Sequence, residues 1–179
     1  MARFLLDPDH TAAQFRVHHM MVTWVHGQFS KVEGTLDFDP QDMGGLSAEA
    51  EIDAASIYTG VEKRDADLRG PNYLDVQNYP LITFKSIRAE AVGLDRCLVH
   101  GELTLHGVTR PVTLEVSFAG PSHFQDDDRL YTTYGLRAKT RINREDFGMI
   151  TNMELENGGF MVGKHVYLTI NVEADLSEA

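Results

Sequence analysis

Hydrophobic and polar residues alternate along most of this 179-residue chain, and a period of two is typical of β-strands with one buried face. The clearest examples are residues 112–118 and 166–174, where apolar side chains occupy every second position. The same alternation, shorter or less regular, occurs at residues 13–17, 32–38, 48–52, 81–89, 96–106 and 130–142. The pattern therefore predicts an all-β protein with about eight strands.

Turn-forming residues separate these predicted strands. Asp39-Pro40 and Gly44-Gly45 divide two of them, residues 93–95 and 107–111 contain further glycine and proline, and three aspartates at residues 126–128 indicate a solvent loop. A set of strands joined in this way must close or stack to remove its unpaired edges, and eight strands can enclose one small ligand. We therefore expect a single domain over residues 1–179, an extended antiparallel β-barrel.

One stretch breaks the alternation. Over residues 55–79 a helical pattern replaces it, in which Asp65 and Arg69 are four residues apart with the acid first, the favourable order on a helix surface. Pro71 ends this segment, and a second short turn follows at residues 73–76. We expect these one or two short helices to cover one end of the barrel.

Charge and composition exclude several classes of partner. The net charge is −11, with 16 basic against 27 acidic residues, so the chain lacks the basic surface that nucleic acids or anionic membranes require. No apolar run reaches the roughly 20 residues that span a bilayer, which predicts no membrane insertion. Asp7-Pro8 ends the first apolar run too early for a signal peptide. As written, the chain is expected in the cytoplasm, or in the periplasm if a leader was removed.

The eight histidines and the lone Cys97 are the candidates for catalytic or metal-binding roles. His100 and His106 share a strand face but are about 20 Å apart along it, too far to share one metal ion. Cys97 has no partner for a disulfide and fits a small apolar strand position. The sequence predicts no catalytic residue, no metal and no covalent cofactor, and a metal site could form only from residues that folding brings together.

Polar contacts to a ligand head group are expected from a small set of residues. Arg64, Asp65 and Arg69 lie on the predicted helix over a barrel end, where arginine could bind a phosphate or carboxylate through two hydrogen bonds. Arg144 and the inward-facing His19 are further candidates. The alternative is that these side chains brace the helix and its loops without contacting ligand.

The apolar part of a ligand is expected to contact the inward face of the first strands. Met20, Met21 and Trp24 interrupt the first long alternation, and methionine adapts to irregular apolar shapes. The alternative is that such residues form plain core. The predicted tail pocket consists of Phe15, Val17, Met20, Met21, Trp24, Phe29, Leu36, Phe84 and Phe147.

Seven blocks of sequence, in order, resemble the YceI-like, lipocalin-like lipid-binding proteins. The first, residues 7–19, is similar to the family's opening D-x-x-H-S-x-x-x-F-x-v-x-H, with Thr11 where serine is usual. The others are residues 27–29 with 34–36, then 52–60, 64–69, 79–84, 101–112 and 142–148. The resemblance implies a long apolar cavity, a ligand among polyisoprenoids, isoprenoid quinones and related amphiphiles, and a homodimer. Bacterial family members are often periplasmic.

Together these observations predict a non-catalytic protein that binds, sequesters or carries an isoprenoid-like lipid, such as a polyprenyl phosphate, an isoprenoid quinone, or a fatty amide or acid. The driving force would be burial of the tail, about 0.8 kcal/mol per methylene. Two alternatives stay open. The barrel could be an enzyme acting on a quinone or prenyl substrate, or it could be the scaffold of a protein-interaction module, because fold alone does not determine function.

Overall fold

A computed structural model describes residues 1–126, 129–156 and 158–177, so Asp127 and Asp128 of the predicted solvent loop lie outside the described residues. The described part contains eleven strands, one α-helix and two 3₁₀ helices. In chain order these are β1 (Ala2–Leu6), β2 (Ala12–His19), β3 (Thr23–Phe29), β4 (Val32–Asp39), β5 (Asp42–Asp53), η1 (Ala54–Ser56), β6 (Ile57–Tyr58), α1 (Glu62–Arg69), β7 (Leu81–Ala91), β8 (Arg96–Leu105), β9 (Val108–Asp126), β10 (Arg129–Asn143), η2 (Arg144–Phe147) and β11 (Val162–Leu176).

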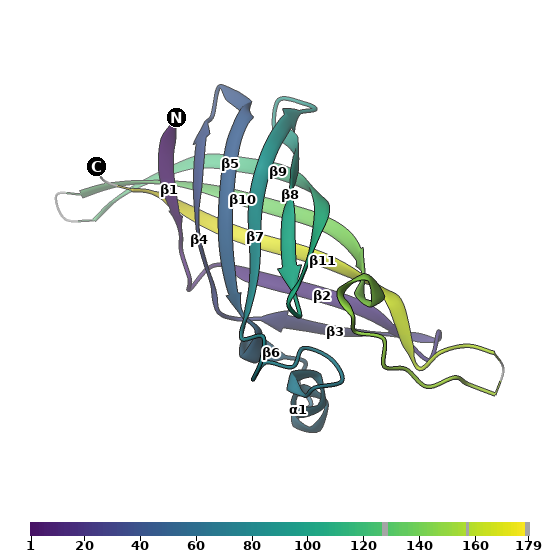
Figure 1. Cartoon of the computed structure of the whole chain (residues 1–179). Helices are drawn as coiled ribbons and strands as arrows, with labels where there is room; N and C mark the ends of the chain where they lie inside the picture. Colours follow the sequence, from purple (N-terminus) through teal and green to yellow (C-terminus); the bar gives the residue numbers. More distant parts are fainter. Residues whose placement is uncertain (127–128, 157, 178–179) are drawn as a thin grey trace.

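Eight of these strands close into an antiparallel barrel, in the order β1-β4-β5-β7-β8-β9-β10-β11, with β11 pairing back onto β1 (Figure 1). The closing pairs run from Phe4 opposite Leu176 to Leu6 opposite Ala174. The other edge of the sheet continues from β11 through β2 and β3 to the short β6. The predicted all-β, eight-stranded barrel is therefore confirmed. One strand differs: β1 belongs to the closed ring, whereas the predicted strand at residues 13–17, which is β2, lies outside it.

The structure adds strands that the alternation did not show. β1 contains consecutive apolar residues, Phe4, Leu5 and Leu6, which hide the period of two. The predicted break at residues 19–24 is a tight turn between β2 and β3 in which Met20 and Met21 have positive φ angles of 50° and 61°. Such angles are uncommon outside glycine, so the residue types there gave no turn signal.

Inward and outward side chains alternate along the second half of β10, from Tyr134 to Ile142. Leu136, Ala138 and Ile142 are buried on the inner face, whereas Arg137 and Lys139 between them are exposed. The same division applies to the partner strands β9 and β11, where the regular alternation of the sequence is clearest. The pattern of residue types thus determines which face of each strand forms the lumen.

An aromatic cluster fills one end of the lumen. Phe38, which is fully buried, stacks on Phe4 with ring centroids 4.6 Å apart and meets Tyr134 edge-on at 5.2 Å. Phe118 packs on the other side of Phe38 at 5.6 Å. Because these four rings come from β1, β4, β9 and β10, they join opposite walls of the barrel and block that end.

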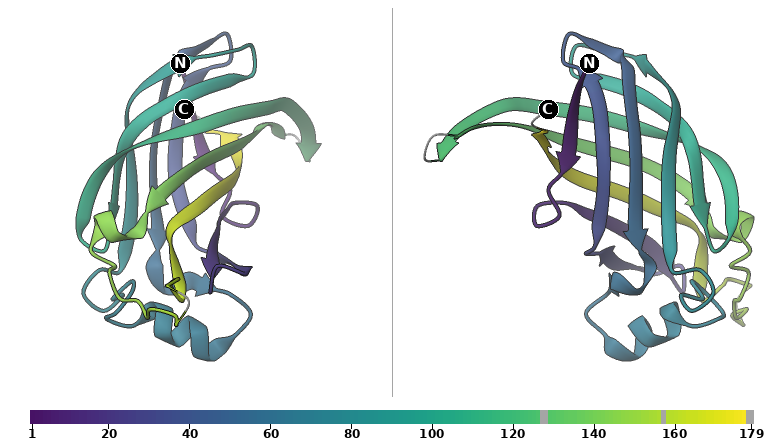
Figure 2. Two further views of the ribbon diagram at one scale, coloured as in Figure 1. Left: turned by 90° about the vertical axis from the view of Figure 1, so that its right-hand side faces the viewer. Right: turned by 60° about the vertical axis from the view of Figure 1, so that its left-hand side comes forward.

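The opposite end carries the helical segment. α1 lies beyond the ends of the barrel strands, in the lower part of both Figure 1 and Figure 2, close to β6. The helix predicted through Asp65 and Arg69 is confirmed, whereas the second segment, residues 73–76, forms turns. Leu68 from α1 and Leu74 from the turns both reach the lumen. This end is therefore covered by loops and a helix, and not by a packed aromatic core.

Candidate functional site

A long apolar cavity occupies the barrel between the aromatic cluster and the helical end. Its volume, traced by the centres of water molecules, is about 230 Å³. Along β10 it extends from Leu136 to Ile142, about 20 Å for six residues of extended chain. Its wall consists almost entirely of aliphatic and aromatic side chains from β2, β4, β5 and β7 to β11. Such a shape suits an elongated apolar molecule.

Five of the nine residues predicted for a tail pocket line this cavity. They are Phe15, Val17, Phe29, Leu36 and Phe84. Phe15 packs beside Phe29 with ring centroids 5.9 Å apart. The same inward alternation that suggested Phe15 and Val17 from sequence thus places them on the lumen face of β2.

The other four predicted tail residues lie off the cavity wall, which corrects their expected position. Met20 and Met21 sit at the exposed β2–β3 turn, 41% and 54% exposed. Trp24 is paired with the outward-facing His18, on which its ring stacks at 3.6 Å. Phe147 is 2% exposed but belongs to η2, and its carbonyl accepts a hydrogen bond from His106. It packs beneath the end of the barrel without reaching the lumen.

The helix residues predicted for a head group form a bracing network and do not reach the cavity. The buried Asp65 carboxylate accepts hydrogen bonds from the backbone N–H and hydroxyl of Thr59, at 2.9 and 2.5 Å. Arg64 donates to the hydroxyl and the carbonyl of Thr59. Arg69 donates to the carbonyls of Ala55 and Ile57. These contacts match the alternative interpretation, in which the side chains attach α1 to the preceding loop.

His19 likewise stays off the cavity wall. Alternation along β2 would turn it inward after Phe15 and Val17, both of which do line the cavity. The pairing of β2 with β11 becomes irregular there, between Val162 and Val166. His19 pairs with Val162 at this irregularity and, unlike Val162, is not among the residues that line the cavity.

Arg144 is the predicted head-group residue that does reach the cavity. It is 3% exposed, and its guanidinium donates hydrogen bonds to the carbonyls of Gly163 at 3.1 Å, Val162 at 3.5 Å, and Met149. Among the described contacts these use three of its five N–H groups. Arg144 also lines the cavity at its helical end, where most of the wall is apolar.

The surroundings of Arg144 make it a buried positive charge. Burial lowers the pKa of the guanidinium from its usual value, and the neighbouring Tyr73 and Glu145 act in the opposite direction. An arginine titrates so far above neutral pH that it stays charged despite such a shift. Carbonyl dipoles stabilise this charge only in part, because they carry no full negative charge. An anion would complete its coordination.

Two further polar residues share the lumen with Arg144, and sequence reasoning missed both. Thr140 lies on the inner face of β10, and Tyr73 comes from the turns after α1. Thr140 was detectable, because it follows Leu136 and Ala138 at the period of two, whereas Tyr73 lies in an irregular segment without such a signal. Gln14 and Glu49 also border the cavity, but their side chains point outward, where Glu49 pairs with Lys85 at 2.6 Å.

Cysteine and histidine side chains lie away from the lumen in the described part of the chain. Cys97 is 1% exposed, and burial raises the pKa of its thiol to about 11, so the thiolate is scarce at neutral pH. Among the described residues, no histidine or cysteine lines the cavity.

No helix in the described part of the chain is sufficiently long and apolar to span a membrane.

Comparison with known proteins places this barrel among related chains. The family model of the YceI-like domain matches residues 4–174. UPF0312 proteins of Staphylococcus aureus, from strains N315 and MSSA476 among others, are 33% identical over 178 residues, covering 99% of this chain and all of theirs.

Solved structures share the fold at lower sequence identity. BcnA of Burkholderia cenocepacia is 23% identical with a TM-score of 0.81, covering 94% of this chain and 98% of its own. A polyisoprenoid-binding domain from Saccharophagus degradans is 17% identical with a TM-score of 0.69, covering 99% of this chain and all of its own. These likenesses support the fold. Given the family match across nearly its whole length, the chain belongs to the YceI-like domain family.

Proposed function

We propose that this protein binds an amphiphilic lipid with an isoprenoid-like tail, and holds it without altering it. The observation that carries the proposal is the long apolar cavity in the barrel, which has the buried guanidinium of Arg144 in its wall. The tail would lie along the lumen toward the aromatic cluster, and the head group would meet the helical end. The polyisoprenoid-binding domain that shares this fold supports the same class of tail.

The charge at Arg144 favours an anionic head group, a phosphate or a carboxylate, over the neutral ring of a quinone. A guanidinium forms its strongest hydrogen bonds with such oxyanions, particularly in a site with little water. The Thr140 hydroxyl and the Tyr73 phenol are additional polar groups at the lumen. A polyprenyl phosphate or a long-chain fatty acid therefore matches the site better than a quinone does.

Titration of the delipidated protein tests this proposal. A fluorescent fatty acid is first bound to the full chain and then displaced by a polyprenyl phosphate, with fluorescence as the readout. We expect saturable displacement at one ligand per chain, because the cavity is a single apolar space inside the barrel. If neither the probe nor the phosphate is taken up, the barrel does not function as a lipid carrier and the proposal fails.

A further inference from the structure

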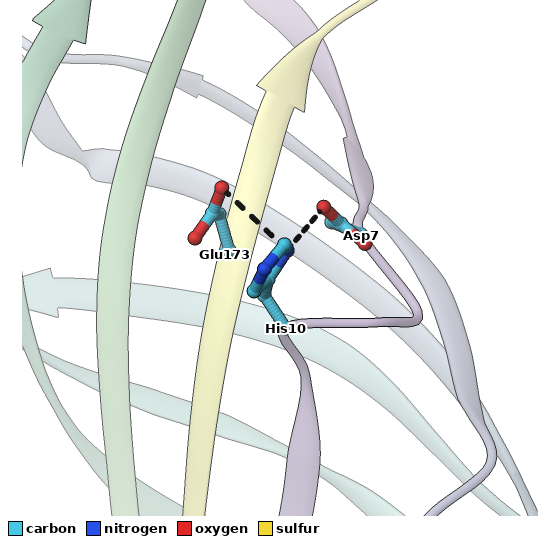
Figure 3. A group of neighbouring side chains, drawn as sticks. All are labelled: Asp7, His10 and Glu173. Atoms are coloured by element: carbon cyan, nitrogen blue, oxygen red, sulfur yellow. Dashed lines mark hydrogen bonds and ion pairs between the residues drawn. The ribbon is translucent and has the colours of Figure 1, made fainter.

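A second group of polar side chains lies on the outside of the barrel, at the seam where β1 meets β11. His10, from the turn between β1 and β2, points its Nδ1 atom at the Asp7 carboxylate, 2.7 Å away, and at the Glu173 carboxylate on β11, 4.0 Å away (Figure 3). One donor atom from each of the three residues lies within 4.8 Å of the others. Three potential metal ligands from two distant segments therefore converge.

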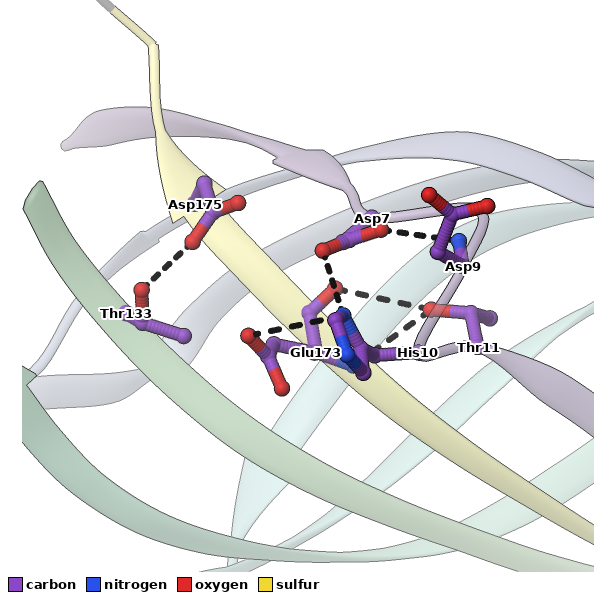
Figure 4. Close-up of polar contacts among 7 residues, drawn as sticks. All are labelled: Asp7, Asp9, His10, Thr11, Thr133, Glu173 and Asp175. Atoms are coloured by element: carbon purple, nitrogen blue, oxygen red, sulfur yellow. Dashed lines mark hydrogen bonds and ion pairs between the residues drawn. The ribbon is translucent and has the colours of Figure 1, made fainter.

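The backbone around this group is held in place independently of the three side chains. The Asp7 N–H donates to the Glu173 carbonyl at 2.8 Å, so the two residues are fixed across the seam. Thr11, which is 4% exposed, exchanges hydrogen bonds through its hydroxyl with the backbone N–H and carbonyl of Glu173 (Figure 4). The ligand positions are thus preorganised, and the side chains need to move little to close around an ion.

We propose that Asp7, His10 and Glu173 form a binding site for a divalent transition-metal ion of the zinc and nickel class. One imidazole nitrogen with two carboxylates is a donor set for such ions, whereas calcium and magnesium prefer oxygen ligands alone. Zinc bonds to nitrogen and oxygen at about 2.0–2.2 Å, which the three side chains can reach by small rotations. Water would occupy the remaining coordination positions on this exposed face.

Charge favours a cation here. The group contains two carboxylates, and the chain as a whole carries −11. Without a metal, a proton on His10 fulfils the same role: its hydrogen bond to Asp7, together with the charges of Asp7, Glu173 and Asp9, raises the pKa of His10. The nearby Asp175 is engaged by the hydroxyl of Thr133. A metal ion would take the place of that proton between the imidazole and the two carboxylates.

The site is separate from the lipid cavity, although it shares the same wall. Leu6 and Val172, the chain neighbours of Asp7 and Glu173, face inward and line the cavity. A bound ion would link the β1–β2 turn to β11 and so strengthen the seam that closes the barrel. The proposal does not depend on lipid binding, and either can fail without the other.

Calorimetric titration of the full chain, stripped with a chelator, tests the site with zinc and nickel chloride at pH 7.5. We expect one ion per chain, and thermal unfolding several degrees higher at about 100 times Kd. His10→Ala and Glu173→Gln should each weaken zinc binding by at least ~10-fold, by analogy with the loss that follows removal of supporting groups around bound metals. The control His26→Ala removes an exposed histidine of β3 and should leave affinity unchanged.

Glu173→Gln keeps both backbone contacts with Thr11, so it tests the site even if His10→Ala folds poorly. In a zinc titration followed by NMR, the imidazole signals of His10 should shift at lower zinc concentrations than those of His26. The proposal is overturned if the wild-type chain binds neither ion, if Glu173→Gln binds zinc as the wild type does, or if His26→Ala loses as much affinity as the two ligand variants.

Discussion

Replacing Ala138 with phenylalanine is expected to weaken lipid binding about 100-fold while the barrel still folds. Ala138 lies midway along the inner face of β10, opposite Val116 of β9 and Ile170 of β11, and all three line the cavity. A phenyl ring at this position points into the lumen from the middle of its length. It enters space that a tail would otherwise occupy, so the wall itself is little disturbed.

The expected loss follows from the tail length displaced. A ring that excludes about four methylenes removes roughly 3 kcal/mol of apolar burial, which corresponds to an affinity about 100-fold weaker. Displacement of the fluorescent fatty acid measures this change, and circular dichroism with thermal unfolding confirms that the barrel is intact.

Lys139→Phe is the matched control, because the same ring is added one residue further along β10 on the exposed outer face. It should bind lipid as the wild type does. If both Ala138→Phe and Lys139→Phe bind lipid with the affinity of the wild type, the lumen is not the binding site.

Replacing Arg144 with glutamine is expected to remove the preference for an anionic head group. We compare a polyprenyl phosphate with the polyprenol of the same tail, so that apolar burial cancels. Hydrogen bonds to a charged group contribute about 1.5–3 kcal/mol each, so the wild type should favour the phosphate by at least ~10-fold. In Arg144→Gln the two ligands should bind about equally, with the alcohol little changed.

The same substitution has a cost in stability, which the experiment must separate from binding. Removing the guanidinium leaves the carbonyls of Met149, Val162 and Gly163 without their donor, and each buried unsatisfied group costs about 1–3 kcal/mol. Arg144→Lys keeps the charge and loses the planar donor arrangement, so it should retain part of the phosphate preference. This variant keeps the test interpretable if Arg144→Gln unfolds.

Arg64→Gln is the control for the loss of an arginine that does not line the cavity. Its guanidinium is bound to Thr59 and does not line the cavity, so the preference for phosphate should persist. A wild-type protein that binds phosphate and alcohol equally would contradict the role of Arg144, as would an Arg144→Gln variant with undiminished preference.

The barrel could be predicted from sequence because the alternation of apolar and polar residues along each strand indicates which side chains face the lumen. Successive side chains of a strand point to opposite faces. Leu114 and Ile170, which alternate with polar neighbours, therefore face inward, and both line the cavity. They were recognisable as inward strand residues, although only strands near the N-terminus and aromatic residues were chosen for the tail pocket. The cleanest alternation, in β9 and β11, was the better guide to the cavity wall.

The polar end of the site was harder to predict, because several arginines occur in similar local sequences. Arg69 and Arg144 differ in their partners, and these lie 5 to 19 residues away in the chain. Arg69 holds the helix to the preceding loop, whereas Arg144, the first residue of η2, follows β10 and lines the cavity. That distinction depends on closure of the barrel. The Asp7, His10 and Glu173 group illustrates the same limit, since β1 and β11 meet only when the ends of the chain pair.

Organic extraction of the natively purified protein, followed by mass spectrometry of the extract, tests the central claim most directly. We predict a long-chain amphiphile with an isoprenoid or fatty tail and a phosphate or carboxylate head, at about one molecule per chain, and its loss in Ala138→Phe but not in Lys139→Phe. An extract without lipid, from protein that also fails to take up the fluorescent fatty acid, would contradict the assignment of this barrel as a lipid-binding protein.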